Sequence, residues 1–169
     1  MDVLAANKLA TRLFGLPEGA SLARFVLLEP AARDLYVEWD DTAAAIVGCL
    51  RLAAGRHPAD RRLAELIADL SRRSPKFREC WAAGEVDLRS SGVKRLRHPA
   101  LGILTLQYEN FTVAGDDTRV LVTLTPEPAT PTEAAFHLLS TWSCSAAGEG
   151  AGHRPPVRSG RAAVEGGCA

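Results

Sequence analysis

Residues 92–113 read GVKRLRHPALGILTLQYENFTV, and this pattern predicts a β-hairpin. The turn is predicted at residues 98–102, which a proline opens and a glycine closes. In the second arm Leu104, Leu106 and Tyr108 alternate with polar residues, which is typical of a strand with one buried face. One face of the hairpin therefore needs an apolar cover from other parts of the chain.

The segment before the hairpin is predicted to be mainly helical, because its apolar residues recur at steps of three and four. We expect a short strand over residues 2–6 and a helix capped by Asn7. A long helical segment follows from Pro30 to Gly55, either as one helix or as two with a break near Asp40-Asp41. A further helix starts at Pro58, and a short helix after Ser74-Pro75 ends at Gly84.

Further strands and one helix are predicted around and after the hairpin. Residues 86–89 and 120–125 are rich in residues that favour strands. Residues 130–133 (TPTE) form a capping box with proline at the first helical position. The helix that it opens places Ala135, Leu138, Leu139 and Trp142 on one face. Helices, about four antiparallel strands and a closing helix indicate an α+β fold.

The chain is expected to form one domain over residues 1–142. From residue 143 onward the composition changes to glycine, alanine, serine, proline and arginine. Such a segment buries too little apolar surface to offset its ordering entropy. Residues 143–169 are therefore predicted to be a disordered tail.

Composition excludes several classes of protein. The chain has 20 basic residues (lysine and arginine) and 20 acidic residues (aspartate and glutamate). Its net charge is therefore zero and does not favour binding to nucleic acid. The four cysteines are far apart, and no cluster has the spacing of a metal site. No signal peptide and no apolar stretch of membrane-spanning length are evident. We expect a soluble cytoplasmic protein with reduced thiols, no metal and no cofactor.

A basic run at Lys94, Arg95, Arg97 and His98 could indicate a nucleic-acid surface. Strand alternation places Lys94 and His98 on one face and the two arginines on the other, and no aromatic residue is interleaved for stacking on bases. A solvated strand is the better interpretation, and contact with an attached DNA-binding domain is the alternative.

No enzyme chemistry is predicted. His57, His98 and His137 lie in no Ser/His/Asp or H-E-x-x-H pattern. Cys80 lies in a short helix near Arg78, which could lower its pKa, but an inert buried thiol is the better interpretation. With no nucleophile–base pair or phosphate loop, we expect a protein that is not an enzyme.

Five phrases, taken in order, resemble one known family. They are DVLAAN..A..LF at 2–14, LARFVLLEPAARDLYVEW at 22–39, LSRRSPKFRECW at 70–81, SSGVKRLRHPALGILTLQYE at 90–109, and TPEPATPTEAAFHLLSTW at 125–142. Together they resemble the ligand-binding domain of MmyB-like transcriptional regulators. The chain departs from the family at Gly84, where relatives usually have a histidine.

The resemblance implies a PAS-like fold, an antiparallel sheet with helices packed on one side around an apolar pocket. It also implies a bacterial transcription regulator that senses a small, fatty-acid-like molecule and contacts DNA only through a preceding helix-turn-helix domain of the Cro/repressor type. Since this sequence begins at the first expected strand of the sensor domain, that DNA-binding domain is expected to be absent from it.

Candidate ligand-binding residues are aromatic, apolar and basic. They are Tyr36, Trp39, Phe77, Arg78, Trp81, Leu104, Leu106 and Tyr108. Arg78 or Arg33 could hold a ligand carboxylate through a bidentate contact. In this hypothesis the hairpin residues face Phe77 and Trp81 across a gap that holds the ligand. Ordinary core packing can account for any one of these residues.

The alternative hypothesis is a protein-interaction or dimerisation module with a solid core. Aromatic and leucine side chains on the helices would then form a partner surface, and the chain would form a homodimer.

Overall fold

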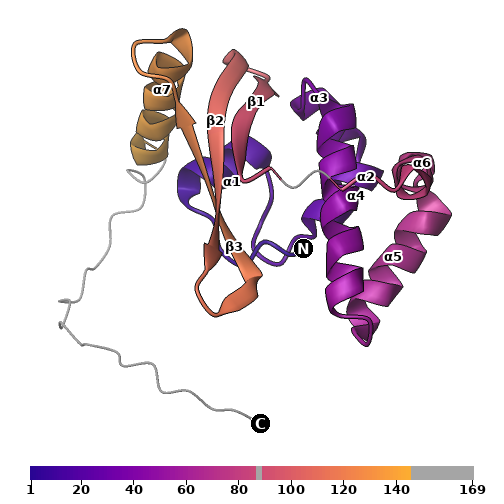
Figure 1. Cartoon of the computed structure of the whole chain (residues 1–169). Coiled ribbons are helices and arrows are strands. Elements are labelled where there is room, and N and C mark those ends of the chain that lie inside the picture. The colour runs from indigo at the N-terminus through magenta and orange to yellow at the C-terminus, as the bar shows by residue number, and fades with distance from the viewer. Residues whose placement is uncertain (87–88, 146–169) are drawn as a thin grey trace, which may run out of the picture.

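The computed structural model describes residues 1–86 and 89–145 of the 169-residue chain. Within these ranges six helices are followed by three strands and a closing helix, which confirms the α+β class (Figure 1). The helices are α1 (Lys8–Phe14), α2 (Leu22–Leu28), α3 (Pro30–Leu35), α4 (Trp39–Arg56), α5 (Arg61–Arg73), α6 (Pro75–Ala83) and α7 (Pro131–Ser145). The strands are β1 (Ser91–His98), β2 (Gly102–Val113) and β3 (Asp116–Pro126).

The sheet is antiparallel, and its strand order is β1-β2-β3. The predicted hairpin is confirmed, because Lys94 pairs with Leu106 and Leu96 pairs with Leu104. Gly102 closes the turn with φ of 73°, in the left-handed region that glycine adopts most easily. This register places the apolar residues of both strands on one face.

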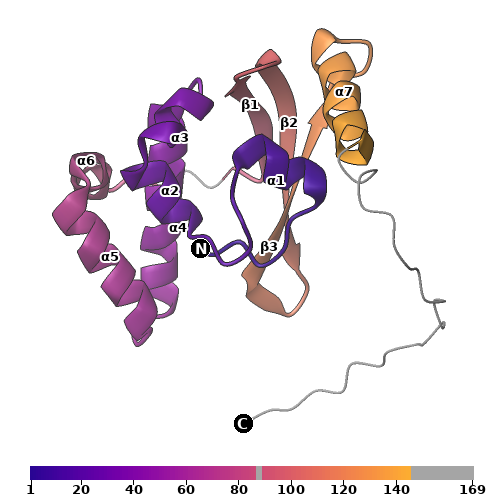
Figure 2. The same cartoon turned by 180° about the vertical axis from the view of Figure 1, so that it is seen from behind.

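The two faces of the sheet differ strongly in burial. On the inner face Leu96, Leu104 and Leu106 are at most 1% exposed. On the outer face Val93 is 65% and Ile103 54% exposed. Helix α1 lies over the inner face and contacts α7, which contacts β2 and β3 (Figure 2). Helices therefore pack on one side of the sheet, as predicted.

Helices α2 to α6 form a block beside the β1 edge of the sheet (Figure 1). The link is the segment between α3 and α4, where Tyr36 forms an antiparallel bridge with Leu96. The Val37 amide also donates a 3.1 Å hydrogen bond to the Arg95 carbonyl. One hydrophobic core extends through the sheet and the block.

Local helix signals in the sequence are confirmed by their hydrogen bonds. The Asn7 side chain caps α1 by accepting a 2.7 Å bond from the Ala10 amide. The Ser74 hydroxyl caps α6 by accepting a 3.1 Å bond from the Phe77 amide. Gly84 ends α6 in the left-handed conformation, with φ of 75°. These ends depend on residues close in sequence, so they could be predicted.

The predicted capping box opens α7. The Glu133 amide donates to the Thr130 hydroxyl at 3.3 Å, and the Glu133 carboxylate accepts from the Ala129 amide at 2.7 Å. Thr132 then ties the start of the helix to the sheet, because its hydroxyl accepts a 3.1 Å bond from the Thr105 amide of β2.

The predicted break of the long helical segment at Asp40-Asp41 is wrong. The helix is interrupted at residues 36–38, between α3 and α4. Tyr36 is extended there because it pairs with β1, a long-range contact that local periodicity does not reveal. Asp40-Asp41 instead lies in the first turn of α4, where the helix dipole favours carboxylates.

The predicted helix start at Pro58 is also wrong. Helix α5 begins at Arg61. Asp60 sets this start, because its carboxylate accepts hydrogen bonds from the Arg62 amide at 2.9 Å and the Leu63 amide at 3.2 Å. A carboxylate that accepts hydrogen bonds from two backbone amides is a strong N-cap. Proline is compatible with the first helical position, but it offers no acceptor for the free amides there.

The described sheet has three strands, not about four. Residues 2–6 do not form a strand, although Asp2 makes an isolated bridge with Ser21. The strand predicted at residues 120–125 is confirmed and is longer, as β3. Of the strand predicted at residues 86–89, positions 87–88 lie outside the described residues.

The end of the domain also differs from its prediction. Residues 143–145 continue α7, and the rest of the predicted tail lies outside the described residues. On α7, Leu139 is buried whereas Leu138 is 51% exposed, so the predicted apolar face is only partly confirmed. The side chain of Trp142 also lies outside the described part.

Candidate functional site

The structure separates the predicted ligand-binding residues into three places. Tyr36, Leu104, Leu106 and Tyr108 gather on the inner face of the sheet. Trp39 lies at the start of α4, beside a cavity. The remaining three residues lie on α6, in the helical block.

The cavity has a volume of about 210 Å³ and lies between α2, α3 and the start of α4. Its wall consists of Val26, Leu27, Leu28, Glu29, Pro30, Arg33 and Trp39. The Trp39 indole is fixed by a 2.8 Å hydrogen bond from Nε1 to the Val26 carbonyl. The Arg33 guanidinium lies 4.2 Å from the centre of the Trp39 ring. This cavity combines an apolar wall with one cation and one acid.

Tyr36 is the most enclosed polar side chain on the inner face, at 3% exposed. Its ring contacts that of Phe14 on α1, with centroids 6.4 Å apart. Burial raises the pKa of the Tyr36 hydroxyl, so this group stays protonated at all physiological pH values. Tyr36 therefore presents a hydrogen-bond donor in an apolar setting.

Lys94 lies between two aromatic rings of the same face. Its Nζ is 5.3 Å from the ring centroid of Tyr36 and 5.2 Å from that of Tyr108. Desolvation lowers the pKa of Lys94, and Cys49 on α4 acts weakly in the opposite direction. Burial in turn raises the pKa of the Cys49 thiol, against the influence of the Lys94 charge. The ammonium thus faces aromatic rings and a neutral thiol.

Phe77 and Trp81 form an aromatic stack that joins α6 to α4. Their ring centroids are 5.2 Å apart, with an interplanar angle of 22°. From α4 the Arg51 guanidinium lies 4.6 Å from the centre of the Trp81 ring and donates a hydrogen bond to the Trp81 carbonyl. This geometry packs two helices together.

The expected arrangement of this stack opposite the hairpin is wrong. Helix α6 lies on the far side of α4 from the sheet in both views (Figures 1 and 2). Phe77 and Trp81 therefore do not face Leu104, Leu106 and Tyr108 across a gap. The intervening long helix, α4, was not predictable as a separating layer from periodicity alone.

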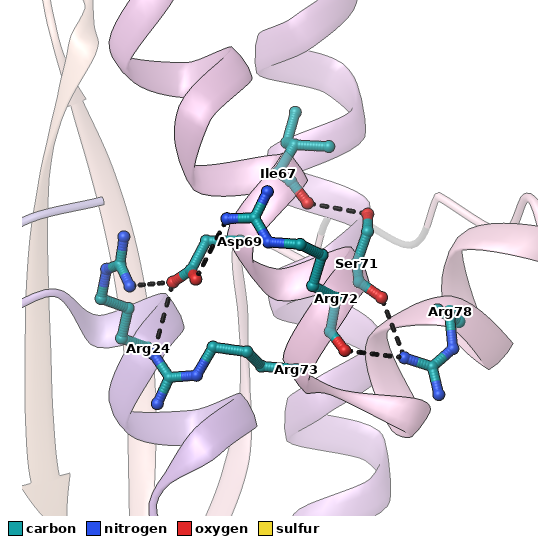
Figure 3. Close-up of polar contacts among 7 residues, drawn as sticks. All are labelled: Arg24, Ile67, Asp69, Ser71, Arg72, Arg73 and Arg78. Atoms are coloured by element: carbon teal, nitrogen blue, oxygen red, sulfur yellow. Dashed lines mark hydrogen bonds and ion pairs between the residues drawn. The ribbon is translucent and has the colours of Figure 1, made fainter.

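Arg78 caps the end of α5. Its guanidinium donates to the Ser71 carbonyl at 2.9 Å and to the Arg72 carbonyl at 3.5 Å, and Figure 3 draws both contacts. These carbonyls belong to the last turn of α5, where backbone carbonyls have no amide donor within the helix. The candidate carboxylate-binding arginine is thus engaged with backbone oxygens.

Asp69 forms ion pairs with three arginines near the end of α5 (Figure 3). It accepts a hydrogen bond from Arg24, and Arg72 and Arg73 lie 3.6 Å and 3.4 Å from its carboxylate. Desolvation acts to raise the pKa of Asp69, but the hydrogen bond and charge of Arg24, with the other two arginines, outweigh it and lower the pKa. The cluster ties α2 to α5 at an exposed position.

The basic run of β1 is divided between the two sides of the sheet. Arg95 on the outer face donates a 2.6 Å hydrogen bond to Glu38, and Arg97 donates to the Asp34 carbonyl at 3.4 Å. His98 accepts a hydrogen bond from the Ala100 amide at 3.2 Å, as a turn residue. These contacts fasten the β1 edge to the segment around α3.

Lys94 and Cys49 are the polar residues that sequence reasoning missed. The signal for Lys94 was present, because alternation places it on the same face as Leu96, and a turn at 98–102 places it opposite Leu106. No sequence pattern indicated that Cys49 lies near Lys94, because this proximity depends on how α4 packs against the sheet.

Other kinds of site find no support in the described part of the chain. Residues 1–86 and 89–145 contain no group of three histidine, cysteine or acidic side chains that could hold a metal. Burial raises the pKa of the Cys80 thiol, so it is not an activated nucleophile. No described helix has both the length and the hydropathy needed to cross a bilayer.

Comparison with known proteins identifies the family. Residues 1–139 match the family model of the MmyB-like transcription regulator ligand binding domain. No curated protein matches the chain. The match covers the helical block, the sheet and most of α7, which are the parts that form the common core. The chain therefore belongs to the family of MmyB-like transcription regulator ligand-binding domains.

Proposed function

We propose that this chain is the cytoplasmic sensor of a bacterial transcription regulator and binds a fatty-acid-like ligand. The observation that carries the proposal is the cavity beside Trp39, because it is lined mainly by apolar side chains and its tryptophan wall is fixed by an indole hydrogen bond. A PAS-like arrangement of sheet and helices, and a helix-turn-helix domain that contacts DNA in the same regulator, are parts of this proposal.

The size of the cavity suggests how binding is coupled to regulation. Its volume of about 210 Å³ is below the roughly 300–1,000 Å³ typical of ligand pockets. We propose that an acyl chain enlarges it by moving α2 and α3 against α4. A ligand shifts a regulator between two arrangements only by binding them with different affinity, and this opening supplies such a difference.

The proposal treats the chain as a binding protein and not as an enzyme. Among the described residues, His57 and His137 are exposed on helix ends and surfaces, and His98 is a turn residue. The sensing role needs only differential binding, and no group has to act as a nucleophile or base.

Thermal denaturation with a panel of saturated fatty acids from eight to sixteen carbons tests the proposal. Binding to the folded state raises the melting temperature in proportion to affinity and concentration. We expect a rise that depends on chain length, with an optimum. Chain-matched alkanes and each acid below its micelle concentration serve as controls. No shift with any acid, alcohol or ester would contradict the proposal.

Homodimerisation is the second candidate function, and the β2–β3 ribbon favours it. Val120, Leu121 and Val122 are each more than half exposed, on the edge strand of the described sheet. Exposed apolar edge strands readily pair with another strand, and two copies of β3 can pair antiparallel about a two-fold axis.

Sedimentation velocity between 5 and 200 µM tests this second function. A dimer that Leu121→Lys dissociates, while Val93→Lys near the other edge does not, would support pairing through β3. A monomer at all concentrations would contradict it.

A further inference from the structure

Most cations with described contacts have an oxygen partner. Lys76 lies 2.8 Å from Asp40 and 3.0 Å from Glu79, and Arg95 pairs with Glu38. Arg51 and Arg78 have no carboxylate partner among the described residues, and both donate to backbone carbonyls. These cations are thus neutralised or hydrogen-bonded, whereas the exposed Arg33 lies over the Trp39 ring.

Lys94 is different, because its ammonium lies on the apolar inner face without such a partner among the described residues. Its contacts are the rings of Tyr36 and Tyr108, and its electrostatic neighbour is the Cys49 thiol. Two ring faces compensate only part of the desolvation of a cation. Burial keeps the thiol protonated, so it supplies no negative charge. The site therefore has an unmatched positive charge.

The rings beside Lys94 are held in place by their surroundings. The ring of Tyr108 lies across Gly92 of β1, where a Cβ atom would come within 2.9 Å of Cε1 and 3.1 Å of the hydroxyl oxygen. Glycine at this position leaves room for the ring next to Lys94. Tyr36 is fixed by its bridge to Leu96. Lys94 and Tyr108 are only half-buried, so these two residues are not sealed from solvent.

We propose that Lys94, with Tyr36 and Tyr108, forms the binding site for the anionic head group of an otherwise apolar ligand. A single carboxylate or phosphate supplies the charge that the site lacks, and the tyrosine hydroxyls are donors available to its oxygens. Leu96, Leu104 and Leu106 provide an apolar floor beneath the group.

This inference rests on the proposed function, in which the apolar chain of the ligand lies in the cavity beside Trp39. It places the anionic head group of the same ligand at Lys94, because the cavity does not suit an anion. The cavity is lined by Glu29 as well as by Arg33, so its wall offers no net positive charge to an anion. One short segment joins the two places, since Arg33 and Trp39 line the cavity and Tyr36 contacts Lys94. An anion at Lys94 thus acts on the same segment as an apolar chain in the cavity.

Isothermal titration of decanoate and decanol against four proteins tests the site. The proteins are the wild type, Lys94→Met, Lys94→Arg and, as a control cation on another element, Arg78→Met. We expect Lys94→Met to weaken decanoate binding by roughly ten- to a hundred-fold, the loss typical of a hydrogen bond to a charged group. Decanol binding should stay unchanged, and Lys94→Arg should keep most of the affinity for decanoate.

The outcomes separate the two proposals. Equal weakening of decanoate and decanol by Lys94→Met, or no weakening of either, overturns the anion site and leaves acyl sensing intact. If neither ligand binds the wild type, acyl sensing fails, and NMR of the Lys94 side chain with acetate and with decyl phosphate then decides. A saturable shift of Lys94 supports an anion site and identifies the head group, whereas no saturable shift with either anion overturns it.

Discussion

Lys94 carries a charge that folding disfavours. In an unfolded chain a lysine has a pKa near 10.4, and desolvation lowers the value in the folded protein. Between the two pKa values the unfolded state binds more protons, so stability rises with pH in that window. Below both pKa values the ammonium is charged in both states, and its desolvation opposes folding. A lysine that destabilises the fold through its desolvation is a candidate for a role in ligand binding.

Lys94→Met should therefore stabilise the ligand-free protein at pH 7. We expect the melting temperature to rise by roughly 2–4 °C, the shift for about 1 kcal/mol in a chain of this size. Methionine retains the apolar contacts with Tyr36 and Tyr108 and removes the charge. Thermal denaturation monitored by circular dichroism measures the change, with Arg61→Met on α5 as the control.

The gain should shrink as the pH rises toward the lowered pKa of Lys94, because the wild-type lysine then begins to lose its proton in the folded state. The groups that face Lys94 are Cys49 on α4, Tyr36 before α4 and Tyr108 on β2. Burial raises the pKa of both Cys49 and Tyr36, so each of them loses its proton only at a higher pH than in an unfolded chain. A destabilised variant, or a gain that grows with pH, would contradict this account of Lys94.

At the scale of single elements, the α5–α6 junction depends on side chains that satisfy helix ends. Ser74 is buried and caps α6, and Arg78 of α6 bonds the last carbonyls of α5. Each contact replaces an intrahelical bond that a helix end lacks. The junction should therefore be sensitive to changes that leave the core untouched.

Ser74→Ala should lower the free energy of unfolding by about 1 kcal/mol, within the range for loss of an N-cap. Its burial leaves the Phe77 amide without access to water, which favours the upper part of that range. Urea denaturation measures the change, and Ser140→Ala on the exposed side of α7 is the control. An effect no larger than that of the control would show that the cap contributes little.

Arg78→Met separates a structural arginine from a ligand-binding one. We expect a loss of about 0.5–1.5 kcal/mol in the free energy of unfolding, from the hydrogen bonds to α5. Ligand affinity should not change, because these bonds already occupy the guanidinium. If the variant binds decanoate at least ten-fold more weakly while its stability is unchanged, Arg78 holds the ligand and the structural assignment is wrong.

At the scale of the whole molecule, the parts predictable from sequence are those set by near neighbours. The hairpin at 92–113, the cap at Ser74 and the capping box at Thr130 depend on residues within a few positions, and all three are present. The break at 36–38 was mislocated because Tyr36 pairs with a strand sixty residues later. Local patterns carry no information on such a contact.

The candidate site shows the same limit. Leu104 and Leu106 were placed on the buried face by alternation alone, and they are buried. The ring stack of Phe77 and Trp81 was expected opposite them, but its distance from the sheet depends on how α4 packs between them. Lys94 was interpreted as a solvated residue because it belongs to a basic run. Its position in the strand register, on the same face as Leu96, indicated the buried side instead.

We propose above all that this fold binds a small apolar ligand with an anionic head. The decisive test is mass spectrometry of the protein purified from bacteria, first in the native state and then after denaturation and extraction. We predict a ligand at close to one per chain in the native spectrum, recovered as an anionic acyl compound after unfolding, and lost from Lys94→Met. An empty protein that also takes up no acyl anion when incubated with a bacterial lipid extract would contradict the claim.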